Sequence, residues 1–258
     1  MSRTEYRYIY GPVSSWRLGR SLGVDPVGGR TKHCNYDCVY CQIGKTRTPV
    51  TKRKVFVTKK GLDRELSVLP PMDLDYITFS GMGEPTLAEN LGELILAVRA
   101  LRKEPVAVLT NASLMHLKDV REALSMADFV AAKLDVSRQE DFREVNRPAR
   151  GITLDRVIRS LTGFSRGFCG KFALQIMFME SNEKSAKDIA RLARQIAPDE
   201  VQINTPLRPC GVKPLSRDRI EKIERSFEGL NTVSVYKGYR KKVRSISPRE
   251  TLKRRGKS

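Results

Sequence analysis

The chain has 258 residues, of which 48 are Lys or Arg and 29 are Asp or Glu, so the formal net charge is +19 at pH 7. Hydrophobic residues make up 40% of the sequence, which at this length can form a buried core and excludes a disordered polymer. The five cysteines are too few, and odd in number, for a secreted disulfide scaffold.

The first residues, MSRTEYRYIYGPV, contain no apolar segment of the kind that a signal peptide requires. No run in the sequence approaches the roughly 18 apolar residues of a transmembrane helix. We therefore expect a cytoplasmic protein without membrane contact. No feature of the sequence points to an obligate protein partner.

Short apolar runs alternate with longer amphipathic stretches along most of the chain. In chain order we expect strands near 20–27 and at 75–80, a helix at 91–101, a strand at 105–110, a helix at 117–125, a strand at 127–135, a helix at 154–164, a strand at 171–179, a helix at 185–196, a strand at 200–204, a helix at 217–227 and a short strand at 232–236. This alternation predicts βαβ units and a parallel sheet.

About six strands are expected ahead of the last short one, which is fewer than a closed eight-stranded barrel needs. We therefore predict an α/β protein with a partial (β/α)6 TIM-like barrel, and a doubly wound sheet is the alternative. In both folds ligands bind at the carboxyl ends of the strands. Small or polar residues follow the expected strands there, at 81–85, 111–113, 135–137, 180–182 and 204–206.

The barrel domain is expected to span residues 1–236 and to be followed by a basic tail at 237–258. The tail holds ten Lys or Arg residues and a single acid, Glu250. We expect it to be disordered at its end and to attract polyanions. With the net charge of +19, it favours nucleic acid as a partner.

Three cysteines lie within eight residues, as Cys34-x3-Cys38-x2-Cys41. Such spacing lets a short loop wrap around one compact centre, and thiolates favour zinc or an iron–sulfur cluster. A structural zinc site would need a fourth ligand, for which the candidates are His33, His116, Cys169 and Cys210. None of these has a paired spacing that favours it, so three ligands and one open coordination position are expected.

The cysteine pattern resembles the cluster loop of the radical S-adenosylmethionine (radical SAM) superfamily, and the segment from Gly81 to Pro85, Gly-Met-Gly-Glu-Pro, resembles that family's second motif. The resemblance implies a radical SAM enzyme with a partial barrel. It implies that Cys34, Cys38 and Cys41 hold a [4Fe–4S] cluster. The open iron of that cluster would bind S-adenosylmethionine, whose reductive cleavage gives a 5′-deoxyadenosyl radical.

The same resemblance implies which side chains contact S-adenosylmethionine. Tyr40 stands at the aromatic position before the last cysteine, near the adenine, and Asn111 at a polar position after the next strand. Asp135 is a candidate for the ribose hydroxyls, with a turn or helix-cap role as the equal alternative. The full set of expected contacts is Tyr40, Gly81, Gly83, Glu84, Pro85, Asn111 and Asp135. An external one-electron donor is also implied.

Residues 11–25 resemble a segment of a radical SAM branch that is grouped near the wyosine-type tRNA-modifying enzymes. This likeness and the positive charge favour tRNA or another RNA as the substrate. One alternative is a radical SAM enzyme that acts on a protein or a small molecule. Another is a metal-dependent RNA-binding protein without enzymatic activity.

Overall fold

The computed structural model describes residues 6–29 and 31–255. Its centre is one eight-stranded sheet in which the spatial order of the strands equals their order in the chain. The strands are β1 (Ile9–Ser15), β2 (Gly19–Val24), β3 (Tyr76–Phe79), β4 (Val106–Thr110), β5 (Phe129–Lys133), β6 (Lys171–Met177), β7 (Glu200–Asn204) and β8 (Thr232–Ser234). β1 is antiparallel to β2, and each later pair of neighbours is parallel.

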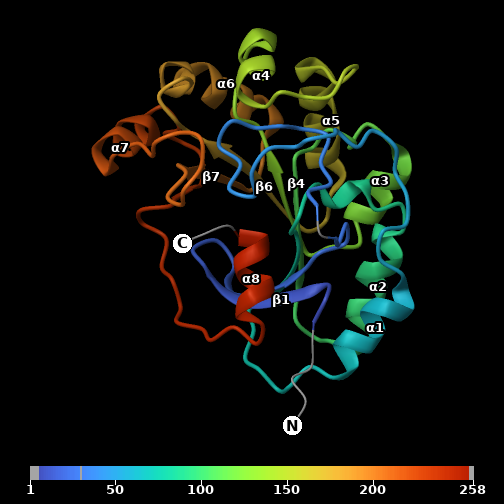
Figure 1. Cartoon of the computed structure of the whole chain (residues 1–258). Coiled ribbons are helices and arrows are strands. Elements are labelled where there is room, and N and C mark those ends of the chain that lie inside the picture. Colours follow the sequence, from blue (N-terminus) through green and yellow to red (C-terminus); the bar gives the residue numbers. More distant parts are fainter. Residues whose placement is uncertain (1–5, 30, 256–258) are drawn as a thin grey trace.

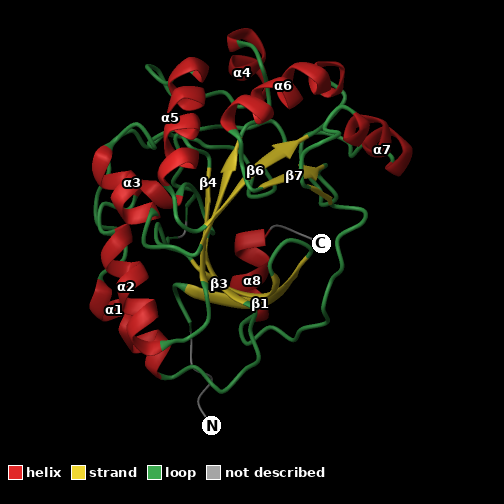
Figure 2. Ribbon diagram, turned by 180° about the vertical axis from the view of Figure 1, so that it is seen from behind, coloured by secondary structure: helices red, strands yellow, loops and turns green. Residues whose placement is uncertain are grey.

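Helices cover the convex face of this curled sheet (Figures 1 and 2). They are α1 (Lys59–Ser67), α2 (Leu91–Leu101), α3 (Lys118–Leu124), α4 (Gln139–Val145), α5 (Leu154–Gly167), α6 (Ala186–Ile196) and α7 (Arg217–Arg225). The last helix, α8 (Pro248–Arg255), lies instead beside β1 on the concave side (Figure 1). The predicted partial barrel is confirmed, and the doubly wound alternative is excluded.

The two faces of the sheet differ in polarity because side chains alternate along each strand. Large apolar residues such as Ile77 and Phe79 point to the helices and join the main core. The concave face holds a second, smaller apolar cluster of Leu18, Ala107, Phe129, Ala131 and Ala173. Leu18 precedes β2, and Ala107, Phe129 and Ala173 lie in the first halves of their strands, so this cluster fills the end of the half-barrel opposite the functional loops.

Most of the expected elements are present with small shifts at their ends. The expected helix at 91–101 is α2, and the expected strand near 20–27 is β2. Four elements were not expected from the sequence: β1, α1, α4 and α8. No helix in the described ranges, 6–29 and 31–255, is long and apolar enough to cross a membrane.

The described part of the predicted basic tail, up to Arg255, is folded against the barrel. The backbone N–H of Ile246 donates to the Gly11 carbonyl at 2.7 Å, and Thr251 accepts from the Gly11 N–H at 2.8 Å. Arg254 in α8 forms an ion pair with Asp25 at 2.8 Å, and both side chains are fully buried. The predicted boundary at residue 237 and the fate of the last residues, 256–258, which lie outside the described ranges, stay predictions.

Replacing Arg254 by Met should destabilise the protein by about 3–5 kcal/mol, because the change leaves the Asp25 carboxylate buried without its partner. Chemical denaturation measures this difference. The matched control is Arg249→Met, which removes an exposed arginine from the same helix and should change stability by less than about 0.5 kcal/mol.

Adding Asp25→Asn to Arg254→Met should recover part of the loss, since the unpaired charge is then removed. Equal stabilities of the Arg254→Met and Arg249→Met variants would show that the buried ion pair does not fasten α8 to the barrel.

Candidate active site

The cysteine loop follows β2 at the carboxyl ends of the strands and lies directly on the Gly-Met-Gly-Glu-Pro loop that follows β3. The His33 N–H donates to the Met82 carbonyl at 2.8 Å, and the Glu84 N–H donates to the His33 carbonyl at 2.9 Å. His33 and Gly83 thus form a parallel bridge outside the main sheet. The two predicted motifs, separate in sequence, form one structural unit.

This contact requires glycine at position 83. A Cβ atom there would lie 1.6 Å from the His33 carbonyl oxygen, which is far inside any van der Waals contact. Gly81 is similarly constrained, because its φ is +147° and a Cβ would lie 2.5 Å from Asp25 Cγ. The glycines of the motif therefore allow close backbone approach on two sides.

The other side of the cysteine loop is held by the end of α4. The Asp37 N–H donates to the Asn146 carbonyl at 3.1 Å, and the Val39 N–H donates to the Val145 carbonyl at 3.0 Å. Within the loop, the Cys41 N–H donates to the Cys38 carbonyl at 3.0 Å. The loop that carries the three thiols is thus fixed by backbone hydrogen bonds on both flanks.

Cys34, Cys38 and Cys41 are free cysteines, and each residue as a whole is partly exposed. N–H donors point at two of the sulfurs: Asn111 Nδ2 lies 3.8 Å from Cys34 Sγ, and Asn146 Nδ2 lies 3.7 Å from Cys38 Sγ. Burial raises the pKa of Cys34 to about 12 and that of Cys38 to about 11, and neighbouring negative groups add to both shifts. A bound metal centre would displace these protons.

The donor set has the chemistry of an iron–sulfur cluster site, because three thiols lie on one short loop. Among residues 6–29 and 31–255, no three His, Cys, Asp or Glu side chains are grouped to hold a single ion. The residues of the loop fit the predicted group by their chemistry, and the ligand set stays a prediction.

The four candidates for a fourth zinc ligand do not join the three cysteines: three of them contact backbone carbonyls, and the fourth is exposed in a turn. His33 Nδ1 is 3.0 Å from the Val27 carbonyl, and His116 Nδ1 is 3.2 Å from the Ser113 carbonyl. Cys169 is exposed in the turn before β6, and the Cys210 thiol donates to the Val212 carbonyl at 3.3 Å. The predicted set of three protein ligands, Cys34, Cys38 and Cys41, stays a prediction.

Glu84 is buried and accepts four hydrogen bonds from the protein. Its Oε1 accepts from the Thr86 N–H and from the hydroxyls of Thr86 and Thr110, the last two at 2.6 Å. Its Oε2 accepts from the Asn111 N–H at 2.6 Å. Burial raises the pKa of Glu84, while these bonds act in the opposite direction. The observed task of Glu84 is to tie the glycine motif to the end of β4; its predicted contact with the cofactor stays a prediction.

Tyr40 and Asp135 meet in a buried network behind the cysteine loop. The Tyr40 hydroxyl donates to Asp135 Oδ2, and Asn146 Nδ2 donates to the same oxygen at 2.7 Å. Asp135 Oδ1 accepts from the Met177 N–H at 2.8 Å, and Lys133 Nζ lies 3.4 Å away. Asp135 is thus a junction between the cysteine loop, β5, β6 and the end of α4. Its predicted contact with the ribose is untested.

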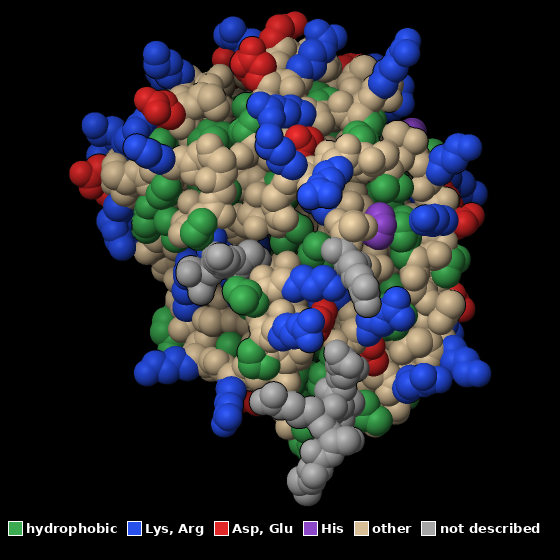
Figure 3. All heavy atoms as spheres, in the orientation of Figure 1, with side chains coloured by type: hydrophobic (Ala, Val, Ile, Leu, Met, Phe, Trp, Pro, Cys, Tyr) green, Lys and Arg blue, Asp and Glu red, His purple; other side chains and the backbone are tan. Residues whose placement is uncertain are grey.

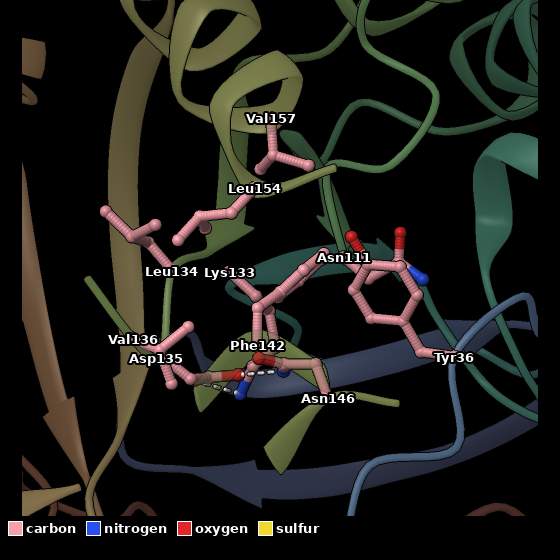
Figure 4. A pocket seen from close by; sticks show the side chains of 10 residues that line it. All are labelled: Tyr36, Asn111, Lys133, Leu134, Asp135, Val136, Phe142, Asn146, Leu154 and Val157. Carbon is pink, nitrogen blue, oxygen red and sulfur yellow. Dashed lines mark hydrogen bonds and ion pairs between the residues drawn. The ribbon is translucent and has the colours of Figure 1, made fainter. Parts of the chain in front are cut away.

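A small pocket opens between this network and α5 (Figure 4). Tyr36, Asn111, Lys133, Asp135 and Asn146 line its polar part. In the described part of the chain, the Tyr36 hydroxyl and Asn146 Oδ1 are buried and have no hydrogen-bond partner. Buried polar atoms without partners are rare in folded proteins, so these two atoms suit a site that takes up a polar group.

Sequence reasoning found the cysteines, the glycine motif, Tyr40, Asn111 and Asp135, and the structure brings all of them to one end of the sheet. It missed Asn146, which contacts the Cys38 sulfur, the Tyr40 hydroxyl and Asp135. It also missed Asn182, whose Nδ2 donates to the Asp135 carbonyl at 2.7 Å. Neither asparagine lies in a motif, so only the fold reveals them.

Comparison with known proteins agrees with this geometry. Residues 30–193 match the family model of the radical SAM superfamily. The chain is 40% identical over 216 residues to UPF0026 protein slr1464 of Synechocystis, covering 83% of this chain and 80% of that protein. It is 32% identical over 231 residues to UPF0026 protein MJ1312 of Methanocaldococcus jannaschii, covering 87% and 71%. The chain belongs to the radical SAM superfamily and, within it, to the UPF0026 proteins; it is a radical SAM enzyme.

The fold is shared with solved structures. The structure of Streptococcus suis SuiB bound to S-adenosylmethionine superposes with a TM-score of 0.63 at 16% identity, covering 84% of this chain and 50% of that one. Membership of the superfamily implies S-adenosylmethionine and an iron–sulfur cluster as cofactors.

Replacing Gly83 by Ala should uncouple the two motifs, because the added Cβ must displace the His33 carbonyl. We expect a folded protein that retains at least tenfold less iron after anaerobic reconstitution and releases correspondingly less 5′-deoxyadenosine. Iron analysis and liquid chromatography measure the two effects.

The matched control for this variant is Gly163→Ala in α5, where a Cβ would meet no atom within 4 Å. It should keep wild-type iron content and gain up to about 1 kcal/mol of stability from helix propensity. Wild-type iron content in Gly83→Ala would contradict the requirement for close backbone approach.

Proposed function

We propose that Cys34, Cys38 and Cys41 hold a [4Fe–4S] cluster and that S-adenosylmethionine binds beside it, along the glycine motif and Tyr40. When bound, this pair supplies one-electron cleavage of a carbon–sulfur bond, which starts radical chemistry on a substrate. The proposal is carried by the backbone ladder that places the cysteine loop on the Gly81–Pro85 loop. An external one-electron donor completes the scheme.

The chain's own residues orient and shield this site. The buried junction of Tyr40, Asp135 and Asn146 closes the rear of the cysteine loop against water. Glu84 fixes the glycine motif to β4, and Asn111 reaches from β4 to the Cys34 sulfur. Such exclusion of water and fixed orientation are the usual contributions of a protein to cofactor-borne chemistry.

We further propose that the substrate is an RNA, with tRNA as the first candidate. The net charge of +19 supports this, because a strongly basic protein surface attracts the phosphate backbone of RNA independently of its base sequence. Lys and Arg side chains are spread over the face shown in Figure 3, with fewer acidic groups between them. The resemblance of residues 11–25 to the branch near the wyosine-type enzymes adds to the proposal and stays a prediction.

Replacing Cys38 by Ala should abolish both the iron–sulfur absorbance of the reconstituted protein and the release of 5′-deoxyadenosine, since the cluster loses one of three ligands. Cys169→Ala removes an exposed thiol far from the loop in sequence and should leave both signals unchanged. A colourless wild-type protein that binds one zinc ion would support the alternative of a metal-dependent RNA-binding protein without enzymatic activity.

Binding to tRNA should weaken steeply with salt. Three exposed basic residues of the C-terminal segment, Lys242, Arg244 and Arg249, make no ion pair within the described chain. Changing all three to Gln should reduce the slope of log affinity against log salt by about two to three. These substitutions avoid truncation of a segment that packs on β1.

The control for the tRNA measurement changes Arg166, Lys184 and Lys187, three exposed basic residues of α5, η2 (Glu183–Ser185) and α6, to Gln. It should leave the slope near the wild-type value. The same slope in both triple variants and the wild type would contradict an RNA footprint on the C-terminal segment.

A further inference from the structure

Four arginines lie in segments that pack on one another, and within the described residues they have no acidic partner; a Cβ on Gly238 of the C-terminal segment, for example, would lie 2.9 Å from Trp16 Cβ. Arg17 lies in the turn between β1 and β2, Arg208 in the loop after β7, Arg240 in the C-terminal segment and Arg255 in α8. Arg208 Nη1 donates to the Arg255 carbonyl at 2.6 Å, which joins two of these segments. Across residues 6–29 and 31–255, none of the four forms an ion pair with a carboxylate. We call Arg17, Arg208, Arg240 and Arg255 the arginine cluster.

Most other buried or partly buried arginines of the described chain have a carboxylate partner: Arg53 pairs with Asp119, Arg219 with Glu183, and Arg254 with Asp25. The exception is Arg121, which donates to two backbone carbonyls instead. In the arginine cluster, Arg17 Nε is buried and has no hydrogen-bond partner in the described structure. Its guanidinium lies 5.2 Å from the centre of the Trp16 ring, which orients it without neutralising it.

The charges of the cluster oppose one another. Burial lowers the pKa of Arg17 to about 10, and the charges of Arg208 and Arg255 lower it further. Burial likewise lowers the pKa of Arg208 to about 10, with Arg255 and Arg240 adding to the shift. The charge of Glu200 acts in the opposite direction and raises the pKa of Arg17.

Glu200 does not neutralise the cluster, because its oxygens are already used. Its Oε2 lies 2.6 Å from Lys171 Nζ, and its Oε1 accepts from Gln202 Nε2 at 2.8 Å. Like charges held together out of water are unfavourable unless an anion compensates them. The arginine cluster therefore has the electrostatics of an anion site.

The arginine cluster borders the candidate active site. Helix α8, which carries Arg255, reaches the glycine motif through Asp25: Arg254 pairs with Asp25 at 2.8 Å, and a Cβ on Gly81 would lie 2.5 Å from Asp25 Cγ. The loop that carries Arg208 also contacts the cysteine loop: a Cβ on Gly211 would lie 2.8 Å from the Val39 carbonyl oxygen. A ligand on these arginines would thus extend toward both motifs.

We propose that the arginine cluster binds a phosphate group of the substrate, so that the substrate of this enzyme is a phosphate ester. Guanidinium groups bind phosphate oxygens through paired, charge-assisted hydrogen bonds, and three or more of them can surround one phosphate. The inference rests on the proposed function in one respect, since the anion is taken to belong to the substrate of the radical reaction. The phosphate comes either from a free nucleotide or from an RNA backbone.

The test compares thermal unfolding of the full-length protein in sodium phosphate and in sodium chloride of equal ionic strength. We expect phosphate to raise the unfolding midpoint of the wild type by several degrees. Arg17→Gln should lose this response and should be at least as stable as the wild type in chloride, because it removes an uncompensated charge. Arg166→Gln, an exposed arginine of α5, controls for general salt effects.

Two results would overturn the phosphate proposal. One is an equal response to phosphate in the wild type and in Arg17→Gln. The other is a clear loss of stability of Arg17→Gln in chloride, which would give Arg17 a structural role. Arg208→Lys keeps the charge but loses the paired donors, so it should bind phosphate about tenfold more weakly while keeping its fold.

A second arm separates the two sources of phosphate by titration with adenosine 5′-monophosphate and with a ten-nucleotide RNA that lacks terminal phosphates. If the backbone is the source, Arg17→Gln weakens RNA binding about tenfold; if a nucleotide is the source, only the monophosphate is affected. If Arg17→Gln binds both the RNA and the monophosphate as tightly as the wild type does, the proposal is overturned. The release of 5′-deoxyadenosine in the same samples reports separately on the proposed function, since cleavage of S-adenosylmethionine needs no phosphate on the arginine cluster.

Discussion

The chemistry of this protein depends on the close approach of two backbone segments, at His33 and Gly83. The carbonyl oxygen of His33 occupies the space that a side chain at position 83 would need, and hydrogen bonds on both sides hold it there. The distance between the cysteine loop and the glycine motif is therefore set by backbone geometry and not by flexible side chains. Glu84 then fixes the pair to β4, so the two motifs are held together at the end of the sheet.

The C-terminal segment supports the same site from the concave side, and the sequence did not reveal this. The apolar alternation predicted β2 to β8 with their main helices, since each buries large side chains at regular spacing. α8 has no apolar stripe; it is held by the Arg254–Asp25 ion pair, and Asp25 in turn packs against Gly81. A buried ion pair and a few hydrogen bonds to Gly11 leave no periodic pattern, so the sequence showed only a basic tail.

In the candidate site too, residues in a local sequence motif could be predicted, whereas residues whose contacts come from distant segments could not. Cys34, Cys38 and Cys41 could be predicted because their spacing is local and their chemistry is specific. The role of Asp135 as a junction could not be predicted, because its partners come from three other segments of the chain. Asn146 follows α4, a short helix with only two buried residues, and its contacts exist only in the folded chain.

The most direct measurement is the electron paramagnetic resonance spectrum of the reduced, anaerobically prepared protein before and after S-adenosylmethionine is added. A cluster held by three thiolates beside the glycine motif has an iron within reach of that ligand, so the spectrum of a [4Fe–4S] centre should change on addition. A cluster spectrum that is identical in the two samples would contradict a shared site, and so would a protein without any iron signal.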